Sequence, residues 1–140
     1  MSDGLSIGLS QALARRRRVT YQRVLGFNMF LHLVVGLICM FMPQLVARTL
    51  DLPPAVPHGW INGWGATLIL VTALYIPGQR DPVRQRYPNF CGIVGRLWMA
   101  TVWFVVGGGF FWMGVFDLSF AIILFLLYIR MIKAELQTRP

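Results

Sequence analysis

The polar side chains that interrupt the long apolar runs of this chain could form a binding site. Arg96 and His32 are ionisable residues inside such runs. A charge at the centre of a bilayer costs at least about 2.5–3.5 kcal/mol on insertion scales, so an ionisable residue there is a functional candidate. With tyrosine hydroxyls nearby, the pair could hold an anionic headgroup, a fatty acid or a quinone carbonyl. The candidate lipid or quinone pocket comprises Asn28, His32, Tyr75, Arg96, Trp103 and Tyr128.

Helical spacing brings these groups to a similar depth. At about 1.5 Å per residue, His32 lies about 13 Å beyond Arg23, and Arg96 lies about 12 Å beyond Pro88. Both are therefore expected in the cytoplasmic half of the membrane, with Tyr75 and Tyr128 near the inner ends of their helices. The alternative is structural: Arg96 snorkels to the interface, and His32 bonds to a neighbouring helix.

Four nearly charge-free runs carry these residues, and each has about the length that spans a bilayer. They are Val24–Ala47, Trp60–Pro77, Phe90–Phe111 and Leu118–Ile129, the last needing its flanking residues to span. Eleven of the 13 Lys and Arg residues lie before the first run, between the second and third, or after the fourth. Four crossings place these segments on one side, the positive-inside pattern. We predict an all-α, antiparallel four-transmembrane-helix bundle with both termini cytoplasmic.

The predicted boundaries divide the chain into an arm, a membrane domain and a tail. Residues 1–22 form a basic cytoplasmic arm, either a short interfacial helix or disordered. Residues 23–134 form the membrane domain, and residues 135–140 form a cytoplasmic tail. Asp117 is expected to be the N-cap of the fourth helix. The four helices are expected at about 23–49, 59–77, 89–112 and 116–133.

The composition favours a membrane protein whose positive charge faces lipid. Hydrophobic residues make up 56% and charged residues 13% of the 140 residues, against roughly 25% charged in an average soluble domain. We interpret the net charge of +8 as contact with anionic headgroups, worth about 1 kcal/mol per basic side chain, and not as nucleic-acid binding. A docking strip for an acidic partner is the alternative. The residues concerned are Arg15, Arg16, Arg17, Arg18, Arg23, Arg80, Arg84 and Arg86.

Small residues predict where helices approach each other closely. Gly59 and Gly63 have the G-x-x-x-G spacing, and Gly107–Gly109 form a triplet near the end of the third run. The triplet could also be a bend where the helix leaves the membrane. The predicted helix-packing glycines are Gly36, Gly63, Gly107 and Gly108.

The residue types argue against an enzyme, a metal site and a cofactor. A zinc or di-iron site needs three or four convergent ligands, and the apolar runs offer one histidine and no mid-span carboxylate. Asp51 and Asp117 are read as an exposed loop residue and a helix cap. Cys39 and Cys91 are expected at different depths, and therefore reduced. No phosphate-binding glycine loop, nucleophile elbow or carboxylate pair is present.

The order of features resembles the small four-helix bacterial membrane proteins grouped as BphX-like or DoxX-like. The resemblance covers about residues 22–135. It consists of a basic start, a first span closed by Met42 and Pro43, a Gly-Trp entry to the second span, and the loop sequence Arg80-Asp81-Pro82. It implies an inner-membrane four-helix bundle and no transferable catalytic residues.

These observations lead to three functional hypotheses. The first is a non-catalytic accessory subunit that stabilises or positions a larger inner-membrane complex, with other membrane protein subunits as partners. The second is a lipid- or quinone-binding protein that uses the His32 and Arg96 cluster. The third is a homo-oligomeric transporter or channel, because four helices without inverted halves are too few for a monomeric transporter.

Overall fold

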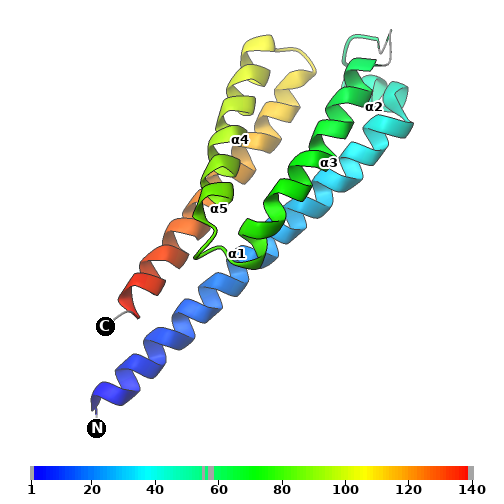
Figure 1. Ribbon diagram of the computed structural model, residues 1–140. Helices are drawn as coiled ribbons and strands as arrows, with labels where there is room; N and C mark the ends of the chain where they lie inside the picture. The colour runs from blue at the N-terminus through cyan, green and yellow to red at the C-terminus, as the bar shows by residue number, and fades with distance from the viewer. Residues whose placement is uncertain (1, 55, 57–58, 139–140) are drawn as a thin grey trace.

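The structure is a computed structural model that describes residues 2–54, 56 and 59–138, with side chains from residue 8 onward. Its described part contains helices and no strands (Figure 1). The four long helices are each long and apolar enough to cross a membrane. The all-α, four-span prediction is thereby confirmed. The elements are α1 (Ser2–Phe41), α2 (Pro43–Thr49), α3 (Gly59–Arg80), α4 (Arg86–Val106) and α5 (Phe110–Gln137).

Helix α1 ends where Pro43 interrupts the first apolar run. Proline has no N–H to donate and its ring clashes with the preceding turn, so a helix breaks or kinks there. The side-chain amide of Asn62, in α3, donates to the carbonyl of Met40 at 2.7 Å, satisfying one acceptor in the last turn of α1. The single helix predicted at 23–49 is therefore two helices, α1 and α2.

Other predicted boundaries also differ from the structure. The arm at 1–22 is continuous with the first span, because α1 runs without interruption from Ser2 to Phe41. Helix α4 ends at Val106, and α5 begins at Phe110 instead of near residue 116. Asp117 is consequently not an N-cap but lies seven residues into α5. The helix content of the tail also exceeds the prediction, since α5 continues to Gln137.

The helices form two pairs that meet through α1 and α5. Helix α1 packs along α3 and α5, and α4 packs along α5, whereas α3 and α4 make much less contact. Figure 1 shows the α1–α3 pair and the α4–α5 pair separating toward the end that carries α2. Helices α3 and α4 are therefore the neighbouring long helices that contact each other least.

Glycines set the close approach of α1 to α3. A Cβ added to Gly36 would lie 2.9 Å from the carbonyl oxygen of Gly65, and one added to Gly65 would lie 2.6 Å from that of Gly36. The other predicted packing glycines do not serve this purpose. An added Cβ at Gly63, Gly107 or Gly108 would meet no atom of the described residues within 4 Å. Instead, Gly107 and Gly108 have φ values of 73° and 58° and form the turn between α4 and α5.

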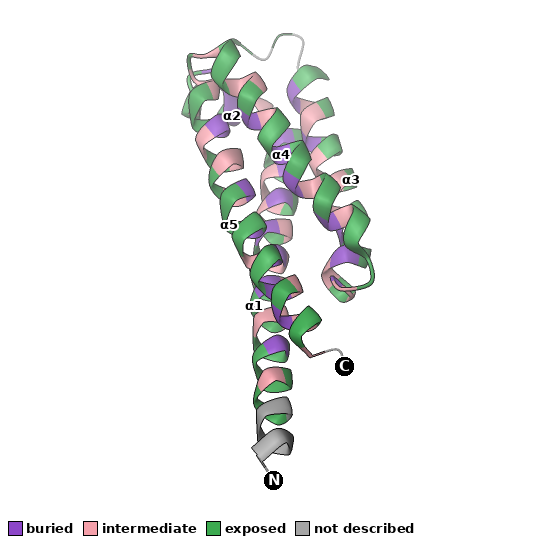
Figure 2. Cartoon of the chain, turned by 90° about the vertical axis from the view of Figure 1, so that its left-hand side faces the viewer, coloured by how far each residue is buried: buried purple, intermediate pink, exposed green. Residues whose placement is uncertain are grey.

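Two small cores hold the bundle together, and the outward surface is apolar. One core contains Tyr21, Leu25, Tyr75, Ile93, Leu124, Tyr128 and Met131. The other contains Cys39, Val46, Ala47, Leu52, Ile61 and Met113. Figure 2 shows buried residues as stripes along the helices, with exposed residues on the outward faces. Those faces carry large side chains such as Phe27, Phe30 and Leu70, as the hydrocarbon of a membrane requires.

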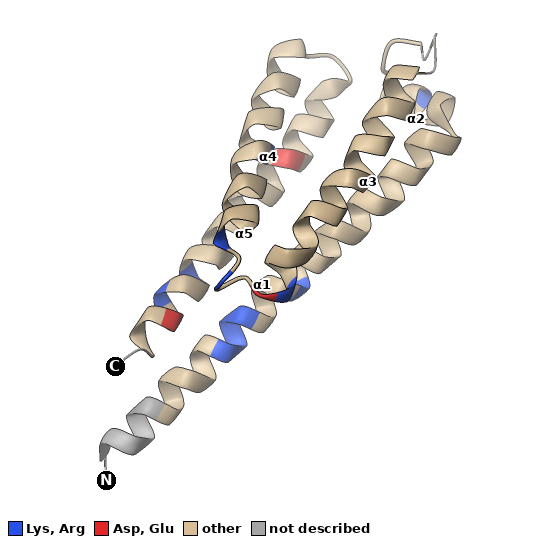
Figure 3. Ribbon diagram, viewed as in Figure 1, with Lys and Arg blue, Asp and Glu red and all other residues tan. Residues whose placement is uncertain are grey.

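The basic residues gather at one end of the bundle. We call this the basic end; it contains the loop at 81–85, the C-terminal turns of α5 and the basic stretch of α1 (Figure 3). The opposite, far end contains α2 and the glycine turn at 107–109. Of the Lys and Arg residues, Arg48 is at the far end and Arg96 lies at the middle of α4.

Candidate functional site

Arg96 is the centre of a polar cluster inside the bundle. It lies midway along α4 and its side chain is 3% exposed. Its Nη1 donates to Oδ1 of Asp117 at 2.8 Å, forming an ion pair between α4 and α5. Its Nη2 donates to Oδ1 of Asn28 at 2.7 Å and also contacts Nε2 of His32, both on α1. Three helices therefore meet at one guanidinium group.

Asp117 completes the cluster and was missed by the sequence analysis. Both of its carboxylate oxygens accept hydrogen bonds, Oδ1 from Arg96 and Oδ2 from Nε1 of Trp103 at 3.2 Å. The expectation of no mid-span carboxylate is therefore wrong. It followed from placing the start of α5 six residues late, which made Asp117 a cap instead of an inward-facing residue. The signal that could have found it was its alignment with Ala121, a small residue on the same helical face.

The bonds at Arg96 fix which atoms of its partners carry protons. A guanidinium group can only donate hydrogen bonds, so the atoms it contacts must accept them. Nε2 of His32 is therefore unprotonated, and the ring is neutral with its proton on Nδ1. By the same argument the amide of Asn28 presents oxygen to Arg96 and keeps its Nδ2 group for another partner.

The cluster retains hydrogen-bond donors that have no partner. Within the part of the chain that is described, no acceptor is available to Nδ2 of Asn28, Nδ1 of His32 or Nε of Arg96. All three atoms are buried. A buried donor without an acceptor costs about 1–3 kcal/mol. The cluster is thus an incomplete hydrogen-bond network with an excess of N–H groups.

Aromatic rings surround the cluster. The guanidinium carbon of Arg96 lies 6.0 and 5.4 Å from the ring centroids of Phe116 and Phe120, within reach of cation–π attraction. The rings of His32 and Tyr75 are 6.1 Å apart. The hydroxyl of Tyr75 donates to the carbonyl of Gly92 on α4 at 3.4 Å.

An apolar cavity of about 740 Å³ lies beside the cluster, between α3 and α4. His32, Arg96 and Asp117 are part of its wall. The cavity extends from Tyr87, next to the basic end, to Trp112, near the far end; these side chains are 78% and 66% exposed. Its volume is in the range of about 300–1,000 Å³ that is usual for small-molecule sites. Other lining residues include Val35, Leu68, Val71, Leu74, Tyr75, Gly95, Met99, Met113 and Phe116.

Tyr128, also predicted in the pocket, lies elsewhere. It is eleven residues after Asp117 on α5, about 16 Å along the helix axis toward the basic end. Its ring packs on Tyr21 at 5.3 Å. Tyr21 donates to Oδ1 of Asn89 at 2.9 Å, and Asn89 donates to the carbonyls of Gly78 and Gln85. These bonds tie the loop at the basic end to α1, and we assign Tyr128 to that structural cluster.

Some of the arginines predicted to contact headgroups or a partner are bonded within the chain, and the others are exposed. Arg18 pairs with Glu135 of α5, and Arg84 lies 3.7 Å from Asp81. Arg17 donates to the carbonyl of Arg130 at 3.1 Å. The remaining predicted contacts are exposed at the basic end: Arg15, Arg16, Arg23, Arg80 and Arg86.

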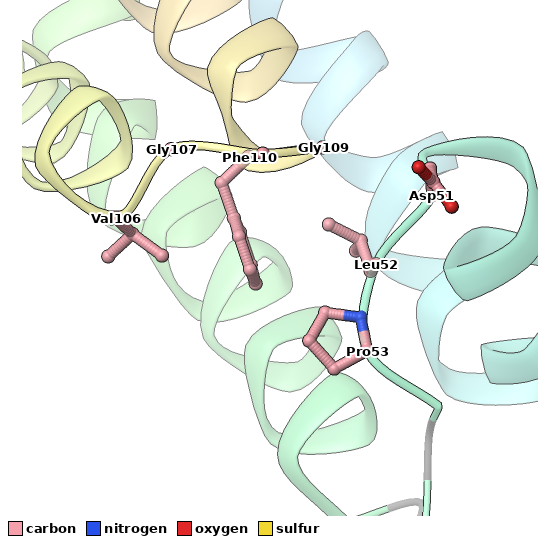
Figure 4. Close-up of a pocket in the computed structure, with 8 residues that line it drawn as sticks. Asp51, Leu52, Pro53, Val106, Gly107, Gly109 and Phe110 are labelled. Atoms are coloured by element: carbon pink, nitrogen blue, oxygen red, sulfur yellow. The ribbon is translucent and has the colours of Figure 1, made fainter.

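A second pocket, of about 440 Å³, lies at the far end. It is lined by residues 51–53 and 106–110. Figure 4 shows the side chains of Leu52 and Pro53 facing Phe110 across it. This pocket contains no buried charged group, so the cavity beside Arg96 is the stronger candidate.

The fold and the site together define a class. Among the described residues no group of three or more His, Cys, Asp or Glu side chains could hold a metal ion, and Cys39 and Cys91 are free thiols. Comparison with family models, curated proteins and solved structures found no match. The chain is a multi-pass membrane protein in which a buried Arg–Asp–His–Asn cluster borders an apolar cavity.

Proposed function

We propose that this membrane protein binds an amphiphilic molecule of the bilayer, a lipid or a quinone, in the cavity between α3 and α4. The polar head would lie at Arg96 and His32, and the apolar tail along the cavity wall. The observation that carries this proposal is the presence of unpartnered buried donors on residues that line an apolar cavity.

A purely structural role for Arg96 explains less of the geometry. A buried ion pair needs its remaining protons satisfied if it is to offset the cost of desolvation. Here Asp117 neutralises the charge, yet Nε of Arg96 and Nδ1 of His32 are left without acceptors among the described residues. Both atoms are buried, so a head group in the cavity would reach them once these two side chains turn toward it.

The setting we propose is a bacterial inner membrane, with both termini in the cytoplasm. Its support is the gathering of basic residues at one end of the bundle (Figure 3), because Lys and Arg accumulate on the cytoplasmic side. Exposed arginines such as Arg15, Arg16 and Arg80 would contact anionic headgroups there.

Filling the cavity tests the proposal without touching the polar cluster. Gly95 lines the cavity, and an added Cβ would meet no described atom within 4 Å. The variant Gly95→Leu therefore places a side chain in space that the ligand would occupy. Gly63→Leu is the matched control, since Gly63 is also an exposed helical glycine with free space around it, but does not line the cavity.

The measurement is the lipid and quinone content of each purified protein, by native mass spectrometry and solvent extraction. We expect about one tightly bound molecule per chain in the wild type and in Gly63→Leu, and a loss of most of it in Gly95→Leu. Equal content in all three folded proteins would overturn the proposal.

A further inference from the structure

We infer that the head group bound at Arg96 is uncharged and presents carbonyl oxygens, as a quinone or an ester lipid does, and is not a carboxylate or a phosphate. This inference rests on the proposed function and specifies the ligand of that same site. It follows from two properties of the cluster. The first is the kind of hydrogen-bonding group that has no partner, and the second is the net charge of the cluster.

The groups left over are all donors. Each acceptor that the cluster offers is already in use: Oδ1 of Asn28, Nε2 of His32 and both oxygens of Asp117. The unpaired buried atoms of the cluster around Arg96 are nitrogen atoms that carry hydrogen. A ligand that matches them must supply acceptors.

The charge of the site is already balanced. In the described part of the chain, Arg96 and Asp117 are the only charged residues that line the cavity, and they form an ion pair at 2.8 Å. An anionic head would therefore bring a net negative charge into an apolar site, close to the carboxylate of Asp117. Charge repulsion is strong where the dielectric is low, and burial of an uncompensated charge is costly. A carbonyl oxygen accepts the same hydrogen bonds without adding charge.

The decisive test compares a charged head group with an uncharged one on the same acyl chain. Purified wild-type protein in a nonionic detergent is titrated at pH 8 with methyl palmitate or with palmitate, which share one chain length. Decylbenzoquinone is the third probe. Binding is followed by native mass spectrometry and by the fluorescence of the tryptophans, of which Trp64 and Trp112 line the cavity.

We expect methyl palmitate to bind at least tenfold more tightly than palmitate. The affinity of decylbenzoquinone relative to the ester then distinguishes a quinone from an ester lipid as the source of the carbonyl. Palmitate binding as tightly as its methyl ester would overturn the inference but leave the proposed function standing. The inference is also overturned if no probe binds while the wild type retains a molecule that Gly95→Leu loses. If no probe binds and Gly95→Leu changes nothing, the proposed function itself fails.

One substitution should reverse the preference. Asp117→Asn keeps an acceptor for Arg96 but removes the balancing negative charge, leaving the site cationic. We expect this variant to bind palmitate more tightly than methyl palmitate. An unchanged preference in the folded variant would contradict the charge argument, and the wild-type titration decides the inference if the variant does not fold.

Discussion

At the scale of single residues, Arg96 and Asp117 determine the character of the molecule. Each alone would be an uncompensated charge in an apolar bundle, and together they form a neutral pair with both carboxylate oxygens in use. Removing one partner of a buried pair leaves the other charge unpaired, whereas replacing both by apolar side chains is often nearly neutral. The effects of substituting Arg96 and Asp117 on stability should therefore not be additive.

We predict that Asp117→Leu lowers the free energy of unfolding by about 3–5 kcal/mol. The double variant Asp117→Leu with Arg96→Met should lose much less, because no unpaired charge remains. Both are measured by thermal or denaturant unfolding in detergent. A single variant as stable as the wild type would show that Arg96 is not buried as described.

The same residues show which parts of the site can be predicted from the sequence. Helical periodicity predicts that Asn28, His32, Arg96 and Trp103 lie close together, and in the structure all four belong to one cluster. Periodicity and composition are local properties, so they are readable without a fold. The role of Asp117 could not be read from the sequence, because it depends on where α5 begins. That start is set by a glycine turn with positive φ values.

At the scale of elements, the crossing of α1 and α3 is fixed by two glycines. Gly36 and Gly65 face each other so closely that neither position has room for a side chain against the opposite backbone. The prediction of Gly36 as a contact agrees with this geometry, whereas the glycine of α3 that meets it is Gly65 and not the predicted Gly63. Gly63 and Gly65 belong to the same short segment. Which of the two faces α1 depends on the rotation of α3 about its axis, a tertiary property that no local pattern contains.

We predict that Gly65→Ala destabilises the bundle by about 1–3 kcal/mol, because the new methyl group would force α1 and α3 apart. Gly63→Ala is the control two residues away. It should be neutral or slightly stabilising, since alanine is favoured over glycine in a helix by up to about 1 kcal/mol. Unfolding midpoints of the two variants in the same detergent check the difference, and similar losses in both would contradict the crossing described here.

At the scale of the whole molecule, the described chain is two helix pairs joined along α1 and α5, with its basic residues at one end (Figures 1 and 3). The weak contact between α3 and α4 leaves the cavity on the side that would face lipid. The accessory-subunit and oligomeric-transporter hypotheses, like the resemblance to BphX-like and DoxX-like proteins, stay predictions.

The orientation of the bundle is testable in intact bacterial cells. With Cys91 replaced by serine, Val56→Cys and Arg84→Cys each place an exposed thiol at one end, since Val56 lies between α2 and α3 and Arg84 in the loop at the basic end. We predict that a membrane-impermeant maleimide labels position 56 in intact cells and position 84 only after permeabilisation. The opposite pattern would reverse the proposed topology.

The most direct test of a ligand in the cavity uses a thiol that the chain already has. Cys91 lines the cavity and is exposed, whereas Cys39 is fully buried, so alkylation of the folded wild type should report on Cys91 alone. The measurement is the rate of alkylation by N-ethylmaleimide before and after removal of bound lipid. We predict slow modification in the ligand-bound protein, a severalfold faster rate after removal, and restored protection when methyl palmitate or decylbenzoquinone is added. A rate that does not depend on bound or added ligand would contradict the account.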